Sequence, residues 1–200
     1  MAIKIYVDQG HNPGNINAGA EGNGVVESEV TYWVGIYLAA FLFADPRFEV
    51  KVSRRFPDTV LGTDQASSLR ARVEEANAWP ADYFISIHAN ANPNPNINGS
   101  EVYVYQRNSV AYDLAVDVLD SIVNIVKTKD NLVRTNPSLY VLRRTNMPAI
   151  LVELGYVTNE EDAQKLLDNQ FLFGLSIYIG ILNYLGLPYD SIPFLTTDEV

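Results

Sequence analysis

The sequence predicts an α/β fold in which a largely parallel sheet is packed between helices. Two observations lead to this prediction. Short runs that are rich in β-branched and aromatic residues alternate along the chain with longer segments in which apolar residues recur at helical spacing. In addition, 48% of the 200 residues are apolar and 19% are charged, which is typical of a chain that folds around one core.

The elements can be placed by these two periodicities. Strands are expected at residues 2–8, 48–53, 82–88, 101–105, 139–142 and 149–153. Helices are expected where apolar residues recur at spacings of three and four, namely at residues 26–44, 66–78, 109–127, 160–168 and 170–185. Because a loop joins 82–88 to 101–105, this pair is expected to add an antiparallel contact to the sheet.

We expect one domain at residues 1–187, followed by a loosely held tail at residues 188–200. The segment 171–187 carries no charge and approaches the roughly 18 to 20 apolar residues of a membrane span. Gly, Ser and Asn interrupt it, and no cluster of Lys or Arg flanks it. A buried helix is therefore expected there, and no membrane span.

Charge and cysteine content exclude several kinds of chemistry. The chain has 14 basic and 24 acidic residues, a net charge of −10, so we expect no nucleic-acid partner. The absence of cysteine excludes disulfides, thiolate metal ligands and thiol nucleophiles. Any histidine-dependent chemistry must use His11 or His88, because these are the only two histidines.

Two loops are expected to carry the functional site, because residues 9–24 and 90–99 both follow the carboxyl end of a predicted strand. His11 lies in the first loop, and His88 ends the strand before the second. One histidine is more often a hydrogen-bonded structural group than a ligand, but two at strand ends indicate a metal site. The third ligand must then be a carboxylate, and the nearby candidates are Asp8, Glu21, Glu27 and Glu29.

Two acidic residues have both a functional and a structural interpretation. Glu27 lies at the start of the first predicted helix, where its side chain can turn back toward the strand ends, although the helix dipole alone favours Glu27 or Glu29 at this place. Glu153 ends an apolar strand, where burial should raise its pKa toward the range of a general acid or base. A salt bridge from Glu153 to Arg143 or Arg144 is the structural alternative.

Five sequence blocks follow one another along the chain: residues 7–11 (VDQGH), 24–27 (GVVE), 68–77 (SLRARVEEAN), 86–91 (SIHANA) and 148–159 (PAILVELGYVTN). In this order they resemble the motifs of zinc-dependent N-acetylmuramoyl-L-alanine amidases of the Amidase_3 type. The resemblance covers about residues 3–187 and identifies this domain as the catalytic domain. It implies a twisted, mostly parallel sheet of about six strands with helices on both faces, as in phosphorylase/hydrolase-like zinc exopeptidases.

The resemblance also implies a site and a reaction. Zinc would be held by His11, Glu27 and His88, and Glu153 would be the catalytic acid and base. The implied reaction is hydrolysis of the amide bond between N-acetylmuramic acid and L-alanine in peptidoglycan. Asn90 and the loop after it, including Asn92, are expected to contact the muramyl peptide, although an Asn-Pro loop is also ordinary turn chemistry.

One block departs from the family pattern. The loop after His11 is slightly longer than usual, and Asn17 takes the place of an acidic residue. We therefore expect the rim of the pocket, and with it the preferred stem peptide, to differ. Arg72, in the helix before the strand of His88, is expected to be structural and to anchor that helix.

Two alternative functions remain open on the sequence alone: a non-catalytic peptidoglycan-binding or regulatory relative, and a zinc peptidase of the same fold. The N-terminus contains no recognisable signal peptide. We therefore expect a phage endolysin, a protein exported by another route, or an excised domain. In each case the protein is expected to act outside the cell or in the cell wall after its release, as an autolysin or an endolysin does.

Overall fold

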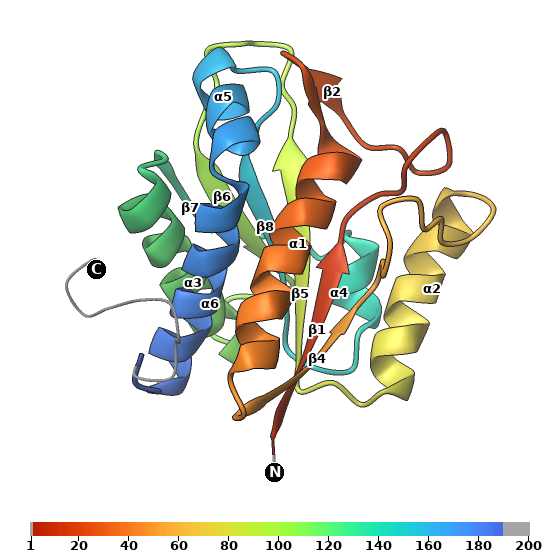
Figure 1. Ribbon diagram of the computed structural model, residues 1–200, viewed down its shortest axis with the longest axis vertical. Helices are drawn as coiled ribbons and strands as arrows, with labels where there is room; N and C mark the ends of the chain where they lie inside the picture. Colours follow the sequence, from red (N-terminus) through yellow and green to blue (C-terminus); the bar gives the residue numbers. More distant parts are fainter. Residues whose placement is uncertain (1, 190–200) are drawn as a thin grey trace.

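The computed structural model describes residues 2–189, and it confirms the expected α/β fold (Figure 1). One sheet with the strand order β4-β1-β5-β8-β6-β7 forms the centre of the molecule, and β2 and β3 form a separate small ribbon. The strands are β1 (Ile3–Gln9), β2 (Glu21–Gly22), β3 (Val25–Val26), β4 (Phe48–Val52), β5 (Tyr83–Asn90), β6 (Ser100–Val104), β7 (Asp130–Thr135) and β8 (Ala149–Tyr156). The helices are α1 (Glu27–Ala44), α2 (Gln65–Ala78), α3 (Val110–Val126), α4 (Tyr140–Arg144), α5 (Glu160–Asp168) and α6 (Gln170–Leu185).

The sheet is parallel except at one junction. Strands β1, β4, β5 and β8 run in the same direction, whereas β6 pairs antiparallel with β8 and parallel with β7. An antiparallel contact between residues 82–88 and 101–105 is expected from the sequence, and this prediction is wrong, because β8 lies between β5 and β6. The antiparallel partner of β6 is β8. Almost every residue of β8 is buried, and a strand that is apolar on both faces belongs in the centre of a sheet.

The strand expected at residues 139–142 is wrong, because Tyr140–Arg144 form the short helix α4. An apolar run of this length fits either element, and here Val141 and Leu142 pack against the sheet from a helix. The remaining strand of the sheet is β7, which the sequence pattern does not predict. As an edge strand it buries only Val133, so its sequence DNLVRT shows no apolar run.

Helices α1, α3 and α6 cover one face of the sheet, and α2 and α4 cover the other (Figure 1). Helix α6 is buried along most of its length, which confirms the buried helix expected within 171–187. Gly180 permits close packing of α6 on α3, because a Cβ there would lie 2.5 Å from the Cα of Val118. Among the helices of residues 2–189, none has the length and hydropathy needed to cross a bilayer.

The direction of the strands positions the functional site. Because β1, β5 and β8 are parallel neighbours, their carboxyl ends lie at the same edge of the sheet. The loops after β1 and β5 begin at this edge, which is where open α/β sheets carry their sites. From residue 190 onward, the expected tail lies outside the described residues.

Candidate metal centre

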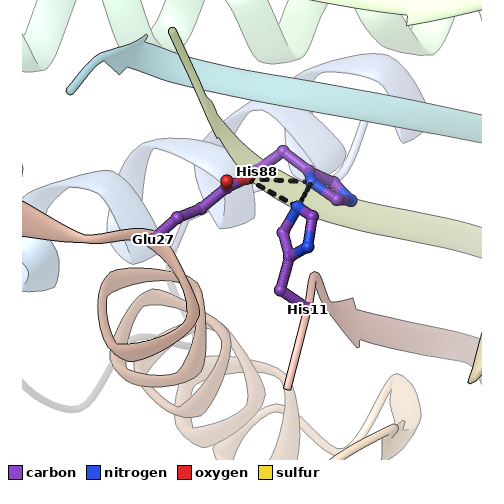
Figure 2. A group of neighbouring side chains, drawn as sticks. All are labelled: His11, Glu27 and His88. Carbon is purple, nitrogen blue, oxygen red and sulfur yellow. Dashed lines mark hydrogen bonds and ion pairs between the residues drawn. The ribbon is translucent and has the colours of Figure 1, made fainter. Parts of the chain in front are cut away.

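Three side chains that are far apart in the sequence meet at the carboxyl edge of the sheet (Figure 2). His11 Nε2 and His88 Nδ1 each lie 3.1 Å from Glu27 Oε1, and the two nitrogens lie 3.1 Å from each other. The three atoms thus form an equilateral triangle. The structure brings together the three residues that the sequence analysis proposes as metal ligands, and they form a possible metal-binding site.

His11 is oriented by the loop in which it lies. The residue follows β1 in the left-handed region, with a φ of 65°, and its Nδ1 lies 3.1 Å from the backbone carbonyl oxygen of Asn17. When Nδ1–H donates to this carbonyl, Nε2 carries the lone pair that faces Glu27 and His88. Because the backbone of Asn17 makes this contact, the orientation of His11 does not depend on the side chain at the position that departs from the family pattern.

Glu27 is the first residue of α1, and its carboxylate turns back toward the strand ends. Its Oε2 accepts a hydrogen bond from the Ala20 amide at 2.8 Å, and its Oε1 accepts one from the Ala89 amide at 3.0 Å. Burial alone would raise the pKa of Glu27, but hydrogen bonds with His11 and His88 lower this pKa well below its usual range. The carboxylate is therefore ionised and fixed in orientation.

The triangle fits a zinc ion. Tetrahedral zinc binds imidazole nitrogen and carboxylate oxygen at about 2.0–2.2 Å, which places two of its ligand atoms about 3.3 Å apart. The observed separations of 3.1 Å are close to this value. Two imidazoles and one carboxylate are also a known ligand set of catalytic zinc sites, in which the fourth position stays open for water or substrate.

Glu153 lies next to this cluster. It pairs with His88 on neighbouring parallel strands, so the two side chains project from the same face of the sheet, with their strands about 4.8 Å apart. His11, His88 and Glu153 line one pocket of about 270 Å³. The wall of this pocket also contains a group of apolar side chains: Leu69, Leu139, Val141 and Leu151, with Tyr140 beside them.

The carboxylate of Glu153 has no structural partner that would explain its burial. Its Oε2 is shielded from solvent and makes no hydrogen bond within residues 2–189. Arg143 and Arg144 are exposed on α4, and neither forms an ion pair with Glu153 in the described part of the chain. Burial, followed by repulsion from the carboxylates of Glu27 and Glu101, raises the pKa of Glu153 well above its usual range.

The other carboxylates considered as ligands are not part of this triangle, although Asp8 lines the same pocket. Asp8 is buried and accepts hydrogen bonds from Arg72 Nη1 at 2.5 Å and from Ser86 Oγ at 2.8 Å. Glu21 and Glu29 are exposed. Arg72 also donates to the backbone carbonyl of Gln9 at 2.5 Å, so it links α2 to the end of β1.

Asn90 ends β5 and Asn92 lies in the loop after it, and both side chains take part in local hydrogen bonds. Asn90 Nδ2 donates to Glu101 Oε1 at 2.8 Å, and Asn90 Oδ1 accepts from the Ala91 amide at 2.9 Å. Asn92 Oδ1 accepts from the Asn94 amide at 2.9 Å. Their side chains thus help to fix the shape of this loop.

Sequence reasoning missed Glu101, which is only 1% exposed. It lies opposite Glu153 in the antiparallel pairing of β6 with β8. Glu101 carries the same sequence signal as Glu153: it is a single carboxylate within a strand of apolar and aromatic residues.

Comparisons with known proteins agree with this geometry. The family model described as N-acetylmuramoyl-L-alanine amidase matches residues 5–183. The N-acetylmuramoyl-L-alanine amidase CwlM of Bacillus licheniformis is 35% identical over 172 residues, which are 85% of this chain and 63% of CwlM. LytC of Bacillus subtilis, named as the same kind of amidase, is 35% identical over 164 residues, which are 81% of this chain and 31% of LytC. The chain therefore spans less than two thirds of the length of these two relatives.

A solved structure has the same fold. The N-acetylmuramoyl-L-alanine amidase from Clostridium difficile 630 superposes on this chain with a TM-score of 0.82 at 31% sequence identity. The match covers 92% of this chain and 97% of that chain. The mostly parallel sheet flanked by helices, which the resemblance implied, is thereby confirmed.

Proposed function

The chain belongs to the N-acetylmuramoyl-L-alanine amidase family, and we propose that it hydrolyses the amide bond between N-acetylmuramic acid and L-alanine in peptidoglycan. The observation that carries this proposal is the 3.1 Å triangle of His11, Glu27 and His88, with Glu153 in the same pocket. Such a site combines a place for a metal ion with a group that can move a proton.

Zinc is the metal that we propose for this site. His11 Nε2, His88 Nδ1 and Glu27 Oε1 would hold it, because these atoms already face one another at the separations that a tetrahedral ion requires. When bound, zinc would act as a Lewis acid: it would polarise the carbonyl oxygen of the scissile amide and lower the pKa of a bound water from ~15.7 toward ~7.

Glu153 is the proposed catalytic acid and base. Its carboxyl group lines the pocket and its Oε2 has no hydrogen-bond partner in the described part of the chain, so the group is available to accept a proton from the attacking water. The same carboxyl group then delivers a proton to the departing amine of L-alanine. The raised pKa of Glu153 suits both steps, because a group whose pKa lies nearer the working pH both accepts and donates readily.

The muramyl peptide would be held around this centre. Leu69, Leu139 and Leu151 line the pocket and would exclude bulk water from the reacting bond. Asn90 and Asn92 are the proposed contacts at the rim, through the hydrogen-bonding capacity that their local contacts leave unused.

The proposal is tested by digestion of purified peptidoglycan, with and without a metal chelator, followed by mass spectrometry of the products. We expect the zinc-loaded protein to release peptides that begin with L-alanine and to leave the glycan strands whole. Peptides cut within the stem would instead indicate a zinc peptidase of the same fold. The absence of any product would indicate a non-catalytic wall-binding or regulatory relative.

We propose that the protein acts at the cell wall. Its net charge of −10 would cause repulsion from anionic wall polymers, so docking would depend on the pocket or on a partner. Delivery as an endolysin or by export is compatible with this site of action.

A further inference from the structure

A second charged cluster lies beside Glu153 on the same face of the sheet. Glu101 of β6 pairs with Glu153 of β8, and Glu153 in turn pairs with His88 of β5. Because paired residues project from the same face, these three side chains form a row that crosses three neighbouring strands. The row begins at the metal centre and ends next to the edge strand β7.

Glu101 is held firmly in this row. Its Oε1 accepts hydrogen bonds from Asn90 Nδ2 at 2.8 Å, from Tyr103 OH at 3.0 Å and from Tyr156 OH at 3.1 Å. Its Oε2 lies 2.7 Å from Arg134 Nε and forms an ion pair with it, but it accepts no hydrogen bond within the described residues. The three hydrogen bonds to Oε1 fix the carboxylate that pairs with the arginine.

Arg134 is the member of the cluster that faces solvent. Its side chain is 54% exposed, whereas that of Glu101 is 2% exposed. Its nearest approach to Glu101 is through Nε, which also donates to the Asn131 carbonyl oxygen at 3.2 Å. Within residues 2–189, neither Nη group of Arg134 makes a hydrogen bond. The exposed guanidinium therefore has both Nη groups free of hydrogen bonds within the described residues.

We propose that Arg134 binds a carboxylate of the peptide stem and so determines a preference for stems with a free acid over stems with an amidated one. This inference rests on the proposed function and names a further part of the substrate. Two Nη groups on a planar guanidinium match the two oxygens of a carboxylate, which is the geometry of bidentate recognition.

The spacing of the row fits a peptide that leaves the metal centre toward the sheet edge. Neighbouring strands lie about 4.8 Å apart, so Glu101 is about 10 Å from His88 across the sheet. An extended peptide covers about 3.3–3.6 Å per residue. Arg134, next to Glu101, is therefore within reach of an acidic group on the second or third residue of the stem.

The charges around the site favour the same interpretation. An anionic peptide must approach a protein with a net charge of −10, and it passes the carboxylates of Glu153 and Glu101. Arg54 and Arg72 also lie near this edge, but both are buried and donate to protein oxygens. Arg143 and Arg144 are exposed on α4, and in the part of the chain that the structure describes neither is paired with a residue of the row. Arg134 supplies an exposed cation on the proposed path of the peptide.

The competing explanation is that Arg134 only neutralises Glu101. The two explanations predict different kinetic constants for the Arg134→Gln variant on substrates that differ only in one carboxylate. We would measure kcat and KM for synthetic muramyl tripeptides that carry either a carboxylate or a carboxamide on the second residue, and for a second pair that differs on the third. Arg107→Gln is the matched control, since Arg107 is exposed beyond the opposite end of β6.

We expect the wild-type protein to prefer the carboxylate form of at least one pair by about fivefold to tenfold, mainly through KM, because the contact is exposed and partly screened. Arg134→Gln should remove this preference, so that the variant turns over the two members of that pair at similar rates. Arg107→Gln should keep the preference. Arg134→Lys retains a charge beside Glu101 and should lose part of the preference, so the test stands even where the glutamine variant folds poorly.

Three results would overturn the inference. Equal loss of activity on both members of each pair would show that Arg134 only neutralises Glu101. Equal turnover of both members by the wild-type protein would show that no acid is recognised. Failure of the zinc-loaded wild-type protein to cleave any of the tripeptides would overturn the proposed function as well, which distinguishes this result from the first two.

Discussion

Arg72 of α2 donates a hydrogen bond to Asp8 Oδ1 at 2.5 Å, and the same guanidinium donates to the backbone carbonyl of His11. Both side chains of the ion pair are 1% exposed. The loop that carries His11 is therefore fixed by a buried ion pair, in addition to the contacts of His11 with the other two proposed ligands. This arrangement favours a metal site that is largely formed before the metal binds.

The ion pair predicts a large loss of stability when one partner is removed. Arg72→Met leaves Asp8 buried without its cation, and we expect the free energy of unfolding to fall by about 3–5 kcal/mol. Chemical unfolding followed by circular dichroism measures this change. The double variant Asp8→Asn with Arg72→Met should recover part of the loss, whereas strictly additive losses would contradict the pairing.

The same pair predicts how stability depends on pH. Burial raises the pKa of Asp8, but the charge and hydrogen bond of Arg72 outweigh burial and hold this pKa below its usual value. The contribution of Asp8 is therefore complete above its unfolded-state pKa of about 3.9 and is lost as the pH falls through the lower folded-state value. We expect the difference in unfolding free energy between the wild-type protein and Asp8→Asn to shrink below pH ~4. A difference that stays constant down to pH ~2 would contradict this assignment.

Replacement of the proposed acid and base should separate catalysis from metal binding. Glu153→Gln keeps the size of the side chain and removes its proton transfer, so we expect turnover of peptidoglycan to fall by about 10²- to 10⁴-fold with zinc content unchanged. Zinc is measured by elemental analysis of the purified variant. Normal digestion of cell wall by Glu153→Gln would show that the role assigned to Glu153 is wrong.

Loss of a proposed ligand should instead remove both zinc and activity. His88→Ala removes one corner of the triangle, and we expect the variant to lose both zinc and activity. Zinc at 100 times its dissociation constant should raise the free energy of unfolding of the wild-type protein by about 2.7 kcal/mol, and that of the variant by much less. Thermal unfolding with and without a chelator measures this difference. Glu29→Gln is the control, because Glu29 is exposed on the same helix as Glu27. Equal stabilisation of all three proteins by zinc would contradict the proposed ligand set.

The packing of α6 on α3 gives a prediction that is independent of the site. A Cβ at position 180 would lie 2.5 Å from the Cα of Val118, which is closer than two such atoms can approach. Gly180→Ala should therefore cost about 1–3 kcal/mol of stability through strain between the two helices. Zinc content should be unchanged. A free energy of unfolding equal to that of the wild-type protein would show that α6 can shift away from α3 without loss of stability.

The elements that the sequence predicts correctly are those with a strong local pattern. Helix α1 and strand β8 bury long apolar runs, and burial on this scale leaves a periodic signal in the sequence. The short run at residues 139–142 is compatible with a strand or a helix, and the edge strand β7 is mostly polar. In both places the contacts that decide the structure come from outside the segment.

The sequence by itself determined the available chemistry: two histidines, no cysteine, and carboxylates at a helix start and a strand end. It also determined the family motifs, because these are local. Only the tertiary structure decided that His11, Glu27 and His88 come within 3.1 Å of one another, that β8 separates β5 from β6, and that Glu101 links Arg134 to the row beside Glu153. The physical reason is that a periodic pattern reports which side of one segment is buried, whereas strand order and the meeting of side chains depend on packing between segments that are far apart in the chain.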